Sequence, residues 1–274
     1  MSTAWLYELP LWVSGTLILI LLLVAVEVGF RFGLSIRRSN EKAADATRGD
    51  VTLGALLALL GLLLAFTYAF SLSRADLRKQ AVLHEANAIG TAFLRADLAP
   101  EPGRTVLRKR LLDYARTRLV THEMANTQEE LKQVVQRSLK AQAELWPATK
   151  TALEGDIPGP IQASIVTAIN GVLDAHTMRL AAVFDRIPGV VLVLIIIVAA
   201  ISLGTAAYIA GLRGYMSRLR MGAFAFVMAA VIVVIIDFDM PLHGLIQHSN
   251  QSLATLIPDM ETALANRYTL QSAE

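Results

Sequence analysis

The hydrophobic residues of this chain are concentrated in four long blocks that polar segments separate. The blocks cover about residues 11–30, 52–72, 187–212 and 221–238. Each block exceeds the roughly 17 residues that an α-helix needs to cross the hydrocarbon core of a bilayer. The pattern therefore predicts four transmembrane helices, grouped as an N-terminal hairpin in residues 1–73 and a C-terminal hairpin in residues 187–240.

The polar stretch between the hairpins, residues 74–186, is too long for a loop and has helical periodicity. Steps of three and four residues predict two faces, Leu131, Val135, Leu139, Gln142 and Leu145, and Ile161, Ile165, Ala168 and Val172. The helix breakers APEPG, WP and GDIPGP divide the stretch into four predicted helices, at about residues 74–98, 104–120, 127–145 and 160–184.

The first of these helices continues the second span, because neither Gly nor Pro interrupts the chain between Gly61 and Gly90. We therefore expect one long rod that leaves the membrane. The predicted fold is an all-α polytopic membrane protein with a helical extramembrane domain inserted between spans two and three. Residues 241–274 form a predicted tail.

Composition agrees with a membrane protein. Hydrophobic residues make up 54% of the chain and charged residues 18%, against about 25% charged residues in soluble domains. The N-terminal block is longer than a signal-peptide core and no Lys or Arg precedes it, so we expect it to be retained as a span. The absence of cysteine excludes disulfides and thiolate chemistry. The basic residues form no nucleic-acid-binding patch.

Small residues line one stripe of each of two predicted spans. The stripes are Gly54, Ala58, Gly61, Ala65 and Ala69 in span two, and Ala200, Gly204, Ala207 and Gly211 in span three. Such stripes allow helix backbones to approach closely in lipid. We expect tight helix packing there, within or between subunits, rather than a pore wall, although an oligomer could combine the two.

Motifs for enzymatic chemistry are absent. The sequence has no phosphate-binding Gly-rich loop, HExxH or GxSxG. Asp237 and Asp239 lie two residues apart at one helix end, whereas an intramembrane aspartyl protease needs acids near the middle of two facing spans. His243 and His248 are five residues apart, which does not suit metal ligands on one helix face. We therefore predict no enzyme, no cofactor and no metal site.

Four strings resemble, in order and spacing, the prokaryotic bestrophin-like membrane proteins. They are GLLLAFTYAFSLSRADLRKQAVLHEANAIGTAFLR (61–95), LRKRLLDYARTRL (107–119), ELWPA (144–148) and IDFDMPLHGLI (236–246). The resemblance extends from Gly54 to about Leu256. It implies a multi-pass protein of the bacterial inner (plasma) membrane, with two spans, a helical insert and two spans.

The second span also resembles that of the bestrophin ion channels, which are homopentamers with this span around the pore. Their narrow neck consists of large apolar side chains one turn apart, and the resemblance places the neck here at Leu62, Phe66 and Phe70. The arginine-rich stretch that normally follows the neck is replaced by SLSRADLRKQ, and no acidic calcium-binding cluster is present, so calcium gating is not expected.

The orientation in the membrane stays open. The two short loops carry eight Lys or Arg residues and the opposite flanks six, which mildly favours a helical domain outside the cytoplasm. The bestrophin arrangement implies the opposite orientation.

Several charged or polar residues have two readings. Asp237 and Asp239, at the end of span four, would form an interfacial ion pair with Arg74 or Arg186, or a ring of acids at a pore mouth. Glu27 precedes Arg31 by four residues, which predicts a structural ion pair. Glu85 and Asn87 are predicted either to line a vestibule or to pair between helices.

Together these features predict a homo-oligomeric ion channel, with the bilayer, further copies of the chain and permeant ions as its partners. The acids at one face suggest a slight preference for monovalent cations. The alternative is a non-conducting membrane scaffold or sensor whose helical domain binds a partner protein.

Overall fold

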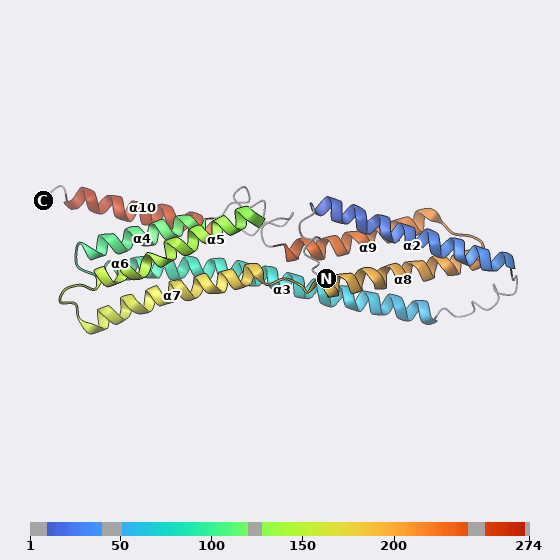
Figure 1. The fold of residues 1–274 in the computed structure, drawn as a ribbon, viewed down its shortest axis with the longest axis horizontal. Helices are drawn as coiled ribbons and strands as arrows, with labels where there is room; N and C mark the ends of the chain where they lie inside the picture. Colours follow the sequence, from blue (N-terminus) through green and yellow to red (C-terminus); the bar gives the residue numbers. More distant parts are fainter. Residues whose placement is uncertain (1–9, 40–50, 120–127, 241–249, 272–274) are drawn as a thin grey trace. The chain divides into compact units, whose positions relative to one another are not determined.

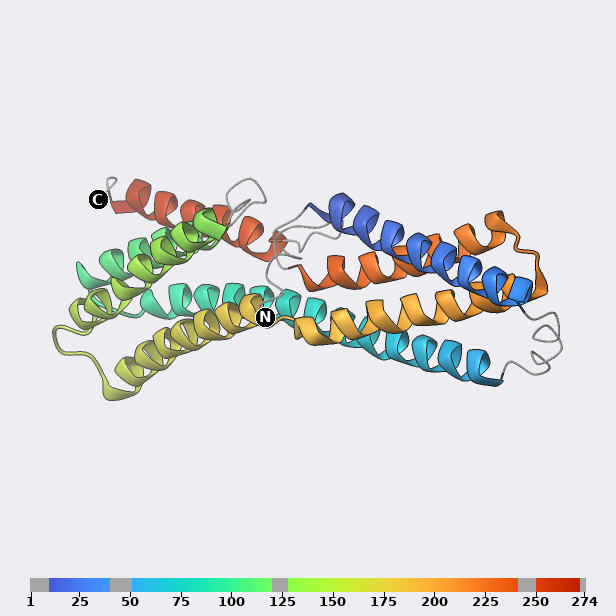
Figure 2. The same cartoon turned by 45° about the vertical axis from the view of Figure 1, so that its right-hand side comes forward.

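The computed structural model describes residues 10–39, 51–119, 128–240 and 250–271, and all regular structure in these ranges is helical. The chain divides into two compact units. Unit 1 holds the described residues up to Arg74 and those from Arg186 to Met240. Unit 2 holds Ala75–Asp185 and the described C-terminal residues. Figures 1 and 2 show the helices of each unit.

Within the described ranges, four stretches of helix are long and apolar enough to cross a membrane, by length and composition. They are Leu11–Ser39, Val51–Ala96, Gly159–Arg213 and Arg218–Asp239. The third stretch contains two helices, because the backbone is extended at Asp185 and Pro188, with ψ angles of 112° and 124°. The prediction of four membrane-spanning helices in an all-α fold is confirmed.

Unit 1 is built from α2 (Leu11–Ser39), the first part of α3 (Val51–Ala96), α8 (Gly189–Arg213) and α9 (Arg218–Asp239). Its core consists of aliphatic side chains from all four helices, among them Leu22, Leu60, Ile195 and Ile232. The hydroxyl of Ser71 on α3 also donates a hydrogen bond to the backbone oxygen of Ile235 on α9, at 2.8 Å.

Helices α2 and α8 meet at glycines. A β-carbon on Gly33 would collide with the backbone oxygen of Tyr208, and one on Gly211 with that of Phe30. The small-residue stripe of the third span is thus used for packing against α2 within the chain. In contrast, a β-carbon on Gly54 or Gly61 of α3 would meet no atom within 4 Å.

Unit 2 combines the rest of α3 with five helices. These are α4 (Gly103–Arg118), α5 (Gln128–Ala143), α6 (Leu145–Ala152), α7 (Gly159–Phe184) and α10 (Gln251–Gln271). Their apolar faces enclose a common core that includes Ile89, Leu111, Ile169 and Leu253. Helix α3 is one continuous helix of 46 residues, as the lack of breakers in its sequence predicted.

Two expectations about unit 2 were wrong in part, and the tail contains a further helix. The WP pair does not end a helix but lies in the first turn of α6, where proline removes no needed hydrogen bond. The tail contains α10, which continues through Pro258. The buried face of α5 carries Val134 and Ser138, whereas Leu139 is exposed. The other predicted positions are half-buried or buried, so the predicted face is wrong only at Leu139.

Candidate functional site

The three predicted neck residues lie on one exposed face of α3. Leu62, Phe66 and Phe70 are 54%, 58% and 64% exposed in the single chain. Their spacing of four residues places them one helical turn apart. Among the described residues, none buries this face, so the three large apolar side chains are available to contact lipid, another subunit or a pore.

The exposed face of α3 continues beyond the neck and becomes polar. This face includes the exposed residues Leu77, His84 and Thr91. Leu77 lies 11 residues after Phe66, and His84 and Thr91 follow at further steps of 7 residues. These steps are close to whole numbers of helical turns, so the residues share one face. Asn87 is exposed as well. The exposure of Asn87 is compatible with a position in a vestibule, and this role stays a prediction.

Asp237 and Asp239 are buried within unit 1, at 3% and 0% exposure. Both carboxylate oxygens of Asp239 accept a hydrogen bond from the backbone N–H of Ile187, at 3.0 and 3.1 Å. This contact ties the end of α9 to the residues just before α8. The ion pair with Arg74 or Arg186 and the ring of acids at a pore mouth both stay predictions.

Glu27 and Arg31 lie side by side on α2. The Nε of Arg31 donates to Oε1 of Glu27 at 2.7 Å, and Arg218 of α9 reaches the same oxygen at 4.0 Å. The predicted pairing of these two residues is thus present as an ion pair on the surface of unit 1.

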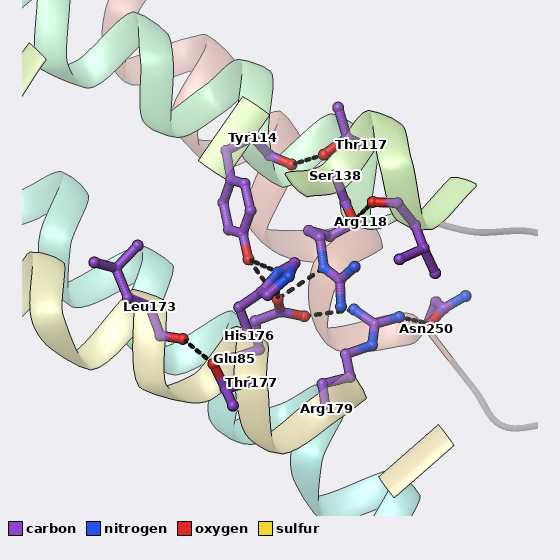
Figure 3. A network of polar contacts seen from close by, with 11 residues as sticks. Glu85, Tyr114, Thr117, Arg118, Ser138, Leu173, His176, Thr177, Arg179 and Asn250 are labelled. Atoms are coloured by element: carbon purple, nitrogen blue, oxygen red, sulfur yellow. Dashed lines mark hydrogen bonds and ion pairs between the residues drawn. The ribbon is translucent and has the colours of Figure 1, made fainter. Parts of the chain in front are cut away.

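Unit 2 contains a buried polar network centred on Glu85 of α3 (Figure 3). Arg118 of α4 donates from Nε to Oε1 of Glu85 at 2.7 Å, and Arg179 of α7 donates from Nη1 to Oε2 at 2.6 Å. The Tyr114 hydroxyl donates to Oε1 at 2.7 Å. Glu85 therefore pairs between helices, which was one of its two predicted roles.

The network also includes His176, on α7 like Arg179, and Asn250 at the start of α10. Nδ1 of His176 on α7 lies 2.9 Å from the Tyr114 hydroxyl. Nη2 of Arg179 donates to Oδ1 of Asn250, the residue before α10, at 3.3 Å. The six residues together connect α3, α4, α7 and the start of α10 inside unit 2.

The surroundings set the charge of each group. Burial favours the neutral form of Glu85, but the charges of Arg118 and Arg179 and the Tyr114 hydrogen bond outweigh it and lower the pKa of Glu85. Burial and then the Glu85 charge raise the pKa of Tyr114. Burial and the Arg118 charge lower the pKa of His176 to about 4. At neutral pH the carboxylate is charged, and the phenol and the imidazole are neutral.

The hydrogen bonds also fix the tautomer of His176. Because the single hydroxyl proton of Tyr114 points to the ionised Glu85, the hydroxyl oxygen must accept a hydrogen bond from the N–H at Nδ1 of His176. Nε2 then carries a lone pair. This nitrogen is buried and has no hydrogen-bond partner among the residues that the structure describes.

Sequence reasoning missed Tyr114, Arg118, His176 and Arg179, although a signal for them exists. Each lies on the buried apolar stripe of its helix at steps of three and four. The stripes are Val82, Glu85 and Ile89, then Leu111, Tyr114 and Arg118, then Ile169, Val172, His176 and Arg179. A charged residue within an apolar stripe is buried when the stripe packs, so it needs a polar partner from another helix.

Metal chemistry finds no support in the described ranges, which contain no group of three or more His, Asp or Glu residues placed to hold an ion. His243 and His248, weighed as ligands from the sequence, lie outside the described residues.

The four apolar stretches of helix define a multi-pass α-helical membrane protein, and unit 2 adds a helical domain with a buried polar network. The chain belongs to the bestrophin-like domain family, whose sequence model matches residues 18–253. Comparison with curated proteins finds no match.

Solved structures share the fold. A point variant of a bacterial bestrophin homologue from Klebsiella pneumoniae superposes with a TM-score of 0.65 at 11% identity, covering 89% of this chain and 98% of that chain. A second variant of a Klebsiella pneumoniae bestrophin homologue gives 0.62 at 9% identity, with 89% and 97% covered. A crystal structure described as a membrane protein gives 0.59 at 10% identity, with 90% and 98% covered. At these identities the likeness concerns the fold.

Proposed function

We propose that the protein is a bestrophin-like, homo-oligomeric ion channel in which α3 of every subunit lines the pore. The observation that carries the proposal is the exposed apolar face of α3 at Leu62, Phe66 and Phe70. Family membership supports it, as does the length of α3, which joins the membrane-spanning part of the chain to unit 2 without a break.

A second open face of α3 supports packing around an axis. The small-residue stripe at Gly61, Ala65 and Ala69 is exposed, and each of these residues directly precedes a neck residue. Successive residues are about 100° apart around a helix, so the small face adjoins the neck face. In a ring of subunits one face would point to the axis and the neighbouring face would receive the next subunit's helix. We expect five subunits.

The neck would control conduction by size and dewetting. Large apolar side chains from each subunit exclude water from a narrow ring, and an ion loses its hydration unless the ring widens. We place the channel in the inner (plasma) membrane of a bacterium, with the bilayer, further copies of the chain and permeant ions as its partners.

A slight preference for monovalent cations is a separate part of the proposal. It rested on Asp237 and Asp239, and both carboxylates are buried in unit 1. Selectivity therefore stays a hypothesis for direct measurement of the reversal potential.

The absence of cysteine from the chain allows a direct test of which face meets the pore. Phe66→Cys and Phe226→Cys are reconstituted in planar bilayers, and a cationic, membrane-impermeant thiol reagent is added during recording. Phe226 is a matched control because it is an exposed phenylalanine of another span, at 60% against 58% for Phe66. We expect the reagent to reduce the current of Phe66→Cys alone.

If the reagent changed the currents of Phe66→Cys and Phe226→Cys equally, the result would contradict a pore along α3. A pure oligomer that passes no ions under any condition would favour the alternative, a scaffold whose helical unit binds a partner protein.

A further inference from the structure

The buried network of unit 2 has an unbalanced charge. Two guanidinium groups, Arg118 and Arg179, face the single carboxylate of Glu85. Tyr114 and His176, the other titratable members, are neutral at neutral pH. Among the described residues of this network, one net positive charge therefore remains, and an uncompensated buried charge is costly.

The ends of two helices modify this charge without removing it. Arg118 is the last residue of α4, whose terminal carbonyls carry a partial negative charge. Helix α10 begins at Gln251, directly after Asn250, and has no acidic residue in its first turn. The N-terminal end of α10 adds partial positive charge on the Arg179 side. The two contributions oppose each other, and the excess of one guanidinium persists.

Arg118 also has hydrogen-bonding capacity left. Toward the described residues it donates from Nε alone, to Glu85. Its side chain is 4% exposed and that of Arg179 is 9% exposed, so solvent reaches the edge of the pair although most of it is buried. Figure 3 shows the two guanidinium groups on the same side of Glu85, facing one another.

We propose that unit 2 binds a small inorganic anion, such as chloride, at the free edge of the Arg118 guanidinium beside Arg179. The anion supplies the second negative charge of the network and accepts hydrogen bonds from Nη1 or Nη2 of Arg118. Guanidinium groups are well suited to this because they stay charged and present several N–H donors in one plane. The site is separate from the conduction proposal and does not depend on it.

The test is the anion dependence of thermal unfolding of the full-length protein in detergent at neutral pH. Chloride, bromide, acetate and gluconate are compared as sodium salts at one ionic strength, so that general screening is constant. We expect saturable stabilisation by chloride and bromide and none by gluconate, which is too large. Stabilisation by acetate alone would assign the site to a carboxylate ligand and overturn the halide assignment.

Two variants change the excess charge in opposite directions. Arg118→Gln leaves one guanidinium against one carboxylate, so the anion dependence should disappear. Glu85→Gln leaves two guanidiniums without a carboxylate, so the dependence should become steeper. Arg108→Gln is the matched control, because Arg108 is a buried arginine of α4 that already has its own carboxylate, Asp97, at 3.0 Å. It should keep the anion dependence of the natural sequence.

The proposal is overturned if the natural sequence unfolds at the same temperature in chloride and gluconate, or if Arg118→Gln keeps the difference. If Arg118→Gln does not fold, crystals of the natural protein grown in bromide decide the question. An anomalous peak within hydrogen-bond distance of Arg118 supports the site, and its absence contradicts it.

Discussion

Oε2 of Glu85 lies 2.6 Å from Nη1 of Arg179, and both side chains are buried in unit 2. The two residues are 94 positions apart in the sequence. Their contact joins the part of α3 beyond the spans to α7, and the same carboxylate also holds Arg118 of α4. Glu85 thus links three helices of unit 2 through one carboxylate.

Glu85→Gln should destabilise unit 2 strongly, because it leaves two buried guanidiniums without their carboxylate. The loss expected for breaking a buried pair of this kind is about 3–5 kcal/mol. Thermal unfolding of the purified protein, followed by circular dichroism, measures it. Glu27→Gln is the control, since the Glu27–Arg31 pair lies at the surface and should contribute little. Equal effects of the two variants would show that the network is not a stabilising element.

Unit 2 should lose stability in acid through His176. Its pKa is about 4 in the folded chain, against 6.5 ordinarily, so the unfolded chain binds the proton first as pH falls. Stability is full above pH 6.5 and declines toward pH 4. The total loss is at most about 3.5 kcal/mol, since one pKa unit is about 1.4 kcal/mol.

The pH dependence of unfolding in His176→Gln checks this expectation. The variant should unfold with a flatter profile between pH 6.5 and 4, because it has no imidazole to titrate. His84→Gln changes an exposed histidine of α3 and should keep the steep profile. A His176→Gln profile as steep as that of the natural sequence would assign the acid sensitivity to other groups.

Gly33→Ala should destabilise unit 1, because the new methyl group collides with the backbone of α8 at Tyr208. A collision with backbone cannot be relieved by a side-chain rotation, so α2 and α8 must separate and lose packing. The unfolding temperature in detergent measures the effect. Gly222→Ala on α9 meets open space and serves as the control. A loss of similar size in both variants would refute the close approach.

Asp239→Ala should weaken unit 1, because the buried amide of Ile187 loses its carboxylate acceptor. A buried donor left unsatisfied costs about 1–3 kcal/mol. Asp239→Asn keeps one oxygen acceptor and should be milder. Asp237→Asn addresses the pore-mouth hypothesis separately. Burial of Asp237 predicts an unchanged reversal potential, and a shift toward anions would instead place this carboxylate in the ion path.

Sequence alone predicted the parts of the fold that depend on local pattern. The four spans follow from hydrophobic length, and the continuity of α3 follows from the absence of breakers after Gly61. The end of α5 and the start of α6 could not be located, because both sides of Glu144 favour helix. Helix α10 lies in the stretch that was predicted only as a tail, and it continues through Pro258.

The buried network was predicted only for Glu85, and there as one of two roles. Its members come from distant parts of the chain, and no spacing rule links residue 85 to residue 118 or residue 179. The tertiary contacts of α3, α4 and α7 decide which charges meet. The neck assignment at Phe66, in contrast, came from the resemblance to the bestrophin channels, and what this side chain faces in the assembled protein depends on other copies of the chain.

The central claim is that Phe66 of each subunit narrows the ion path. The unitary conductance of Phe66→Ala in planar bilayers tests it most directly, beside Phe226→Ala as the control for a lost phenylalanine elsewhere in the membrane. A neck along α3 predicts a larger unitary conductance for Phe66→Ala and an unchanged one for Phe226→Ala. Equal conductance of Phe66→Ala and the natural sequence would contradict it.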